Sequence, residues 1–170
     1  PEELSVTVTN DERNGVKQHI VNLMCTTPGP VMAQLSEALR LIAAVDFPQK
    51  WPTLLPEIIS KLQQNMNDMS IVNGMLETAN SIFKRFRYVQ KTDALLTDLL
   101  AVLKQFQEPM LQLFGHLAQE LERLSSQANP NEALLQQYLK ALRTLARIFY
   151  SLNYQDLPEF FEDHIQQWMG

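Results

Sequence analysis

The sequence is poor in cysteine and glycine, and it has no apolar run long enough to cross a membrane. Its single cysteine, Cys25, cannot form an internal disulfide, and we expect a small, inert side chain packed in a helix. The longest purely apolar run, residues 41–45, is far shorter than the ~20 residues that span a bilayer. The five glycines are isolated from one another, so no glycine-rich loop is available to cradle a phosphate. We therefore expect no disulfide, no membrane partner and no nucleotide cofactor.

Basic charge is scarce as well. The chain carries 14 Lys and Arg against 19 Asp and Glu, a formal net charge of −5, and its one basic cluster is the short KRFR at residues 84–87. Nucleic-acid binding needs a basic face that neutralises phosphates. We therefore expect no nucleic-acid partner, and we expect basic or mixed-charge protein partners instead.

Residues that could carry catalysis or bind a metal are few and scattered. His19, His116 and His164 lie far apart, and none has a Glu three residues before it, the spacing of di-metal sites in helical bundles. No GxSxG turn is present, and no base is evident for Cys25. The sequence therefore predicts no catalytic, cofactor-binding or metal-binding residue.

Helical periodicity is what the sequence does contain. Apolar residues recur at spacings of three and four almost throughout, and strict alternation over a strand length is absent, so the predicted class is all-α. On the first helix the expected apolar side is Val16, Ile20, Leu23 and Met24. Pro109 falls inside the fifth helix and predicts either a kink or two coaxial helices. The predicted helices cover about residues 11–25, 31–45, 54–64, 71–88, 93–125 and 131–153, and a seventh begins near residue 158.

The stretch DFPQKWPTLLPEII, residues 46–59, crowds three prolines into one corner of this helical chain. The prolines are four residues apart, whereas a polyproline II ligand repeats every three. If Thr53 caps a helix that begins at Leu54, the last of these prolines falls in the first turn, where its missing N–H costs no intrahelical bond. Phe47 and Trp51 are then apolar plugs between helical layers. The predicted structural wedge at this corner consists of Phe47, Pro48, Trp51 and Pro52.

A second corner, DLPEFF at residues 156–161, repeats the acid, the proline and the following aromatic, and Pro158 and Phe160 complete the predicted wedge. Both corners follow a long apolar helix and begin a new one, which favours an α-α superhelix of antiparallel helical hairpins, a HEAT-repeat solenoid fragment. The chain also begins with proline and shows no signal peptide, so we expect a segment of a longer stack. The expected units are an extended linker (1–10), hairpins at 11–45, 46–91 and 92–155, the last kinked at Pro109, and the first helix of a further repeat (156–170).

In such a stack the second helix of each hairpin lines the concave side, which makes its charged residues candidates for protein binding. A solvated face also carries such charges, and the cations at 84, 85 and 87 also complement a helix dipole, so both explanations stay open. The candidate protein-binding residues are Glu37, Arg40, Lys84, Arg85, Arg87, Lys140 and Arg143, with Arg147 on the same wall.

Three stretches carry a resemblance to a known family: DFPQKWPTLL (46–55), SIFKRFRY (81–88) and FYSLNYQDLPEFFEDHIQQWM (149–169). They resemble the amino-terminal part of the importin-β (karyopherin-β) family, in the branch of exportins that return importin-α to the cytoplasm. The resemblance implies a monomeric receptor, without a cofactor, that shuttles between nucleus and cytoplasm and binds Ran-GTP together with importin-α. Nucleoporins are further candidate partners. It also implies that Glu37 and Arg40 lie nearest to Ran.

Two other functions remain open. A HEAT-repeat scaffold from another karyopherin, or from a complex unrelated to transport, would show the same helices and corners without this GTPase partner. An enzyme built on a helical bundle is less favoured, because the sequence contains no recognisable catalytic motif.

Overall fold

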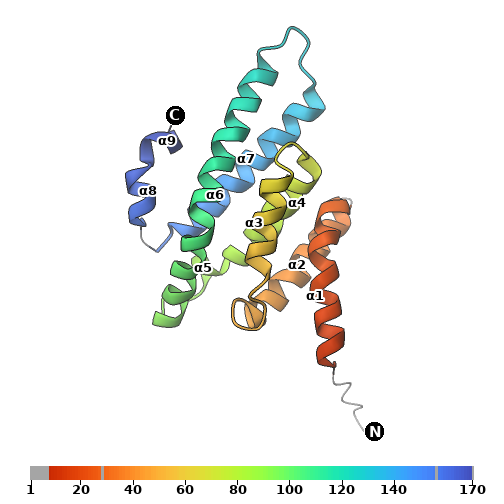
Figure 1. Ribbon diagram of the computed structural model, residues 1–170, viewed down its shortest axis with the longest axis vertical. Coiled ribbons are helices and arrows are strands. Elements are labelled where there is room, and N and C mark those ends of the chain that lie inside the picture. The colour runs from red at the N-terminus through yellow and green to blue at the C-terminus, as the bar shows by residue number, and fades with distance from the viewer. Residues whose placement is uncertain (1–7, 28, 156, 170) are drawn as a thin grey trace.

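The chain folds into helices joined by short connections in the computed structural model, which describes residues 8–27, 29–155 and 157–169 (Figure 1). No strand occurs in these ranges, so the all-α prediction is confirmed. Residues 1–7 of the expected linker lie outside the described residues. The helices are α1 (Asn10–Thr26), α2 (Gly29–Asp46), α3 (Leu54–Gln64), α4 (Met69–Phe83), α5 (Arg85–Tyr88), α6 (Asp93–Ser125), α7 (Glu132–Leu152), α8 (Glu159–Asp163) and α9 (Ile165–Met169).

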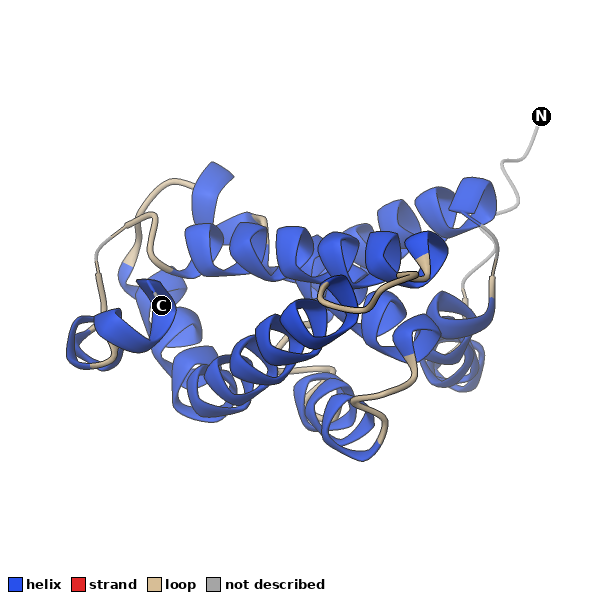
Figure 2. Ribbon diagram, turned by 90° about the horizontal axis from the view of Figure 1, so that it is seen from above, coloured by secondary structure: helices blue, strands red, loops and turns tan. Residues whose placement is uncertain are grey.

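The long helices pair into hairpins, and the hairpins stack side by side in two layers (Figures 1 and 2). The second helices form one layer, because α2 packs against α4, α4 packs against α7, and α5 packs against α7. In the other layer α3 packs against α6, while α1 packs against both α2 and α4. We call α2, α4, Lys84, α5 and α7 the second-helix layer.

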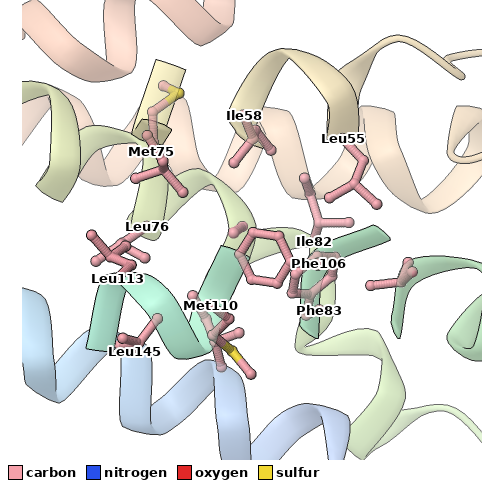
Figure 3. Close-up of a cluster of buried hydrophobic side chains, with 14 of the residues drawn as sticks. Leu55, Ile58, Met75, Leu76, Ile82, Phe83, Phe106, Met110, Leu113 and Leu145 are labelled. Atoms are coloured by element: carbon pink, nitrogen blue, oxygen red, sulfur yellow. The ribbon is translucent and has the colours of Figure 1, made fainter. Parts of the chain in front are cut away.

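Helix α4 lies at the centre of the stack, where α1, α2, α3 and α7 all pack against it. Its Phe83 ring meets Phe106 of α6 edge to face, with ring centroids 5.3 Å apart. Burying side chains of this size contributes roughly 2–3 kcal/mol each. Figure 3 shows this part of the core, built from Leu55 and Ile58 of α3, Met75, Leu76, Ile82 and Phe83 of α4, Phe106, Met110 and Leu113 of α6, and Leu145 of α7.

Helices α1 and α4 come very close together at Gly74. A Cβ atom at this position would overlap the carbonyl oxygen of Met24 and lie 2.8 Å from the Cα of Cys25. One turn earlier, the Ser70 hydroxyl donates a 2.7 Å hydrogen bond to the Cys25 carbonyl. The absence of a side chain at Gly74 therefore sets the distance between these two helices.

The proline corner buries its aromatic residues as predicted, since Phe47 and Trp51 are each 4% exposed. The Phe47–Pro48 peptide bond is cis. Helix α3 begins at Leu54, as expected, but the side chain of Thr53 makes no capping hydrogen bond, so that part of the prediction is wrong. Thr53 already has αR backbone angles, and the residue at the third helical position is Pro56, which has no N–H to donate to a cap.

Several predicted helices differ in their continuity. The expected helix 71–88 is divided at Lys84 into α4 and α5, and the helix expected from Pro158 is divided at His164 into α8 and α9. Helix α6, in contrast, runs unbroken through Pro109, so it is not two coaxial helices. The carbonyl that loses its partner there belongs to Gln105, an exposed residue that water can solvate.

The apolar side of α1 also differs from the prediction. Ile20 and Met24 are buried as expected, but Val16 and Leu23 are about half exposed. Lys17 is buried together with Ile20, because it makes an ion pair that a hydrophobic pattern does not reveal.

Candidate protein-binding surface

The second-helix layer differs in charge from the rest of the chain. Counted from the sequence, it carries seven basic and four acidic residues, a net charge of +3. The remaining residues carry the other seven basic and fifteen acidic ones, a net charge of −8. The net charge of the whole chain therefore conceals a basic face, which complements an acidic partner.

A groove of about 380 Å³ lies between α2 and the α4–α5 junction. It brings together four of the seven predicted binding residues, Glu37 and Arg40 from α2 with Lys84 and Arg85. Its apolar lining comes from other residues of the same segments. These are Ala44, Ile82, Tyr88 and Val89.

Glu37 and Arg40 lie one turn apart on the same side of α2, and their side chains are in contact. Arg40 donates to the two carboxylate oxygens of Glu37, from Nη2 at 2.6 Å and from Nε at 2.9 Å. These hydrogen bonds hold the pKa of Glu37 below its ordinary value. Both side chains are well exposed, so an incoming charged group can take over either member of the pair.

Arg85 lines the groove, but its guanidinium already has partners inside the molecule. Nη1 donates to the carbonyl of Phe47 at 3.0 Å, and Nη2 donates to Oδ2 of Asp98 at 3.0 Å. The other carboxylate oxygen of Asp98 accepts a 3.2 Å hydrogen bond from Gln49. Arg85 therefore ties the proline corner to α6.

A second cation holds the opposite side of the same corner. Lys17 of α1 makes a 2.7 Å ion pair with Asp46, donates to the carbonyl of Lys50 at 3.1 Å, and lies 5.6 Å from the centroid of the Trp51 ring. The hydrogen bond from Lys17 lowers the pKa of the Asp46 carboxyl. We call Lys17, Asp46, Arg85 and Asp98 the corner clamp.

Sequence reasoning missed the corner clamp, although one signal was available. Lys17 stands three, four and seven residues before Ile20, Val21 and Met24, which is the register of the buried side of α1. A charged residue in a buried register requires a partner. Asp98 gave the same signal, since it stands three residues after Leu95 and four before Val102 on the buried side of α6, but its choice of Arg85 as partner depends on how separate helices pack.

Arg87 points to a different environment from Arg85. Its guanidinium lies 5.1 Å from the ring centroid of Tyr88 and 5.5 Å from that of Tyr150. Tyr150 in turn meets Tyr154 edge to face at 5.5 Å. We call these four residues the tyrosine–arginine cluster. The tyrosines were not among the sequence-predicted residues, because their meeting requires the ends of α5 and α7 to lie together.

The remaining predicted residues lie apart from the groove. Lys140 and Arg143 are exposed on α7, on the side away from its buried residues, as is Arg147. At the second corner Pro158 is the residue before α8, and Phe160 is half-buried and stacks on His164 with a centroid distance of 4.3 Å. Phe161, which was not predicted, is the fully buried aromatic there.

The described residues offer little to a metal or a membrane. Nowhere among them are three His, Cys, Asp or Glu side chains grouped so that they could hold a metal ion. None of the described helices combines the length and the apolar character that crossing a bilayer requires. Cys25 is half-buried, and this burial raises the pKa of its thiol.

Comparison with known proteins identifies relatives of this chain. The family model Cse1 matches residues 82–170. Among curated relatives, Exportin-2 of Danio rerio is 39% identical over 162 residues, which is 95% of this chain and 16% of that protein. Exportin-2 of Homo sapiens is 42% identical over 159 residues, 94% of this chain and 16% of that protein. Exportin-2 of Xenopus laevis is 40% identical over 168 residues, 99% of this chain and 17% of that protein.

A solved structure agrees with these relatives. The exportin Cse1 in its cargo-free, cytoplasmic state superposes with a TM-score of 0.89 at 36% identity, covering 96% of this chain and 17% of that one. This similarity confirms the predicted superhelix of helical hairpins. The chain spans 16–17% of the length of these curated relatives. The matched family model and the shared fold together establish that this chain belongs to the Cse1 family of exportins.

Proposed function

We propose that the chain is part of a nuclear export receptor that carries importin-α out of the nucleus in a complex with Ran-GTP. The observation that carries this proposal is the similarity to exportins over 94–99% of the chain. The basic second-helix layer supports it, because such a layer presents charge and apolar surface to a protein rather than a reaction centre.

In this proposal the α2 side of the groove has one partner, and Lys84 with the exposed side of α7 has another. Glu37 and Arg40 contact Ran-GTP, since their exposed ion pair can exchange partners without disturbing the core. Lys84 beside them, with Arg87, Lys140 and Arg143, contacts importin-α. Arg85 lines the same wall, but its guanidinium is bound to Phe47 and Asp98, so it orients the groove.

The receptor then works as a monomer without a cofactor and shuttles between nucleus and cytoplasm, with nucleoporins as transient partners. Binding of Ran-GTP and of importin-α must be coupled reciprocally, so each ligand raises the affinity for the other by the same factor. The repeat units expected at 11–45, 46–91 and 92–155 supply successive pieces of one binding wall.

Capture experiments with immobilised importin-α test the proposal. The full-length receptor that contains this chain is expected to be retained strongly with Ran-GTP and weakly with Ran-GDP. The 170-residue chain alone is expected to retain little Ran-GTP, because in this family Ran also contacts neighbouring repeats. If the receptor is retained equally with Ran-GTP and with Ran-GDP, the proposal is overturned. The chain would then belong to a scaffold protein of another complex.

A further inference from the structure

The tyrosine–arginine cluster combines an exposed aromatic surface with a pre-positioned cation. Tyr88, Tyr150 and Tyr154 are 77%, 53% and 51% exposed, which is unusual for three neighbouring aromatic rings. Arg87 lies between the first two rings at 5.1 and 5.5 Å. Tyrosine and arginine are, with tryptophan, the residues most enriched at the energetic centres of protein interfaces.

The cluster offers hydrogen-bond donors that have no matching acceptor among the described residues. Arg87 takes part in none of the ion pairs found there. Its Nε atom is buried and has no hydrogen-bond partner within the same part of the chain, so an incoming group would meet the terminal nitrogens of the guanidinium. A guanidinium donates through five N–H groups and accepts none, and a phenol donates readily to an anion. The group that completes this cluster is therefore an anionic acceptor.

We propose that the tyrosine–arginine cluster is a docking site for an acidic segment of a partner protein, with a carboxylate on Arg87 and a neighbouring apolar side chain on the tyrosine rings. This proposal deepens the proposed function and rests on it for the choice of a protein partner. The surrounding charge supports it, because the second-helix layer carries a net charge of +3. Lys84 and Arg85 flank the cluster in sequence, and Tyr88 also lines the groove between α2 and α4.

A carboxylate peptide suits this site better than a nucleic acid. A nucleic-acid backbone requires a row of cations along its phosphates, whereas Arg87 is the one cation of the cluster. A single guanidinium held between aromatic rings matches one carboxylate at a fixed position. The two rings restrict the motion of the guanidinium before binding, so the Arg87 side chain loses less conformational entropy when a partner docks.

The proposal is tested by fluorescence anisotropy with a short labelled peptide in which Glu and Asp alternate with Leu. A control peptide replaces these acids with Gln and Asn, and a uridine oligonucleotide of equal length represents nucleic acid. The full-length receptor should bind the acidic peptide. Arg87→Ala should weaken binding at least about tenfold, and Tyr88→Ala several-fold, as expected of interface hot spots.

Two further variants separate the effect of the cluster from that of net charge. Arg87→Lys keeps the charge but loses the planar, stacked donor group, so it should also weaken binding. Arg123→Ala removes a more exposed arginine from the end of α6, where it pairs with Glu120, and should leave binding unchanged. Equal losses in Arg87→Ala and Arg123→Ala, or tighter binding of the oligonucleotide than of the acidic peptide, would overturn the proposal.

The same variants keep this proposal separate from the proposed function. If the Arg87→Ala receptor captures importin-α with Ran-GTP as well as the wild type does, the docking site is wrong while the export function stands. If the wild type captures no importin-α but binds the acidic peptide through Arg87, the docking site stands and the export function is wrong.

Discussion

Arg85 and Asp98 form an ion pair of 3.0 Å that joins the end of the second hairpin to the first turns of α6. Because Arg85 also donates to the carbonyl of Phe47, the same guanidinium fixes the corner between the first two hairpins. Lys17 holds that corner from α1 through Asp46. Lys17 and Arg85, two cations from different hairpins, thus fix the proline corner, and the position of the groove wall depends on this corner.

Removing one partner of this pair is expected to destabilise the fold. Asp98→Asn leaves Arg85 largely buried beside a neutral amide, which should lower the free energy of unfolding by about 2 kcal/mol. Urea denaturation followed by circular dichroism measures this change. The matched control is Glu120→Gln, which breaks the exposed pair with Arg123 and should cost no more than about 0.5 kcal/mol. Similar losses in both variants would contradict the role of Arg85 at the corner.

The Asp46–Lys17 pair predicts a specific pH dependence. Lys17 lowers the pKa of Asp46 from its ordinary 3.8, so the ionised carboxylate stabilises the folded state at all pH values above that figure. This stabilisation is lost as the pH falls through the lower, folded-state pKa. Asp46→Asn should therefore be less stable than the wild type by about 1–2 kcal/mol near neutral pH. The difference should shrink below pH 3.8.

Unfolding free energies of the two proteins, measured from neutral to strongly acidic pH, test this prediction. A gap between wild type and Asp46→Asn that stays constant across the acid range would show that the ion pair does not stabilise the corner.

Gly74 and Gly115 form a matched pair for the close contact between α1 and α4. Gly74→Ala forces a Cβ against the backbone of Met24 and Cys25, so it should lower the free energy of unfolding by about 1–3 kcal/mol. Gly115→Ala places its Cβ in open space within α6, so helix propensity should raise stability by up to about 1 kcal/mol. Thermal melts should show a lower melting temperature for Gly74→Ala and an equal or higher one for Gly115→Ala. An unchanged melt for Gly74→Ala would refute the tight approach.

The two aromatic residues of the second corner should differ in importance. Phe161 is fully buried and meets Phe149 edge to face at 5.0 Å, so Phe161→Ala should cost about 3–5 kcal/mol. Phe160 is half-buried, and Phe160→Ala should cost clearly less. Denaturant titrations of the two single variants give the comparison. The reverse order would restore Phe160 as the main wedge residue.

The sequence predicted most of the helices because their apolar patterns are long and regular. Helix α3 begins and ends where its pattern does, and the proline corner buries Phe47 and Trp51 as expected. The breaks at Lys84 and His164 were missed, since the apolar spacing continues across both residues. A periodic pattern reports which side of a helix is buried, and it does not report a local change in backbone direction.

The candidate binding surface was harder to predict from the sequence than the helices were. The predicted cations were chosen by their place in the second helices, and the groove does gather Glu37, Arg40, Lys84 and Arg85. Nothing in the pattern distinguished Arg85, which is engaged inside the molecule, from Arg87, which lies between tyrosine rings. That distinction depends on contacts with Asp98 and Tyr150, residues brought near by tertiary packing alone.

The most direct test of the account is the affinity of the full-length receptor for importin-α in the presence of Ran-GTP, measured by isothermal titration calorimetry. Reversing two charges of the second-helix layer, in the double variant Lys140→Glu and Arg143→Glu, should weaken binding at least about tenfold. The matched control Lys104→Glu reverses an exposed charge on α6, in the other layer, and should change the affinity less than about twofold. Equal affinities for the double variant and the control would contradict partner binding by this layer.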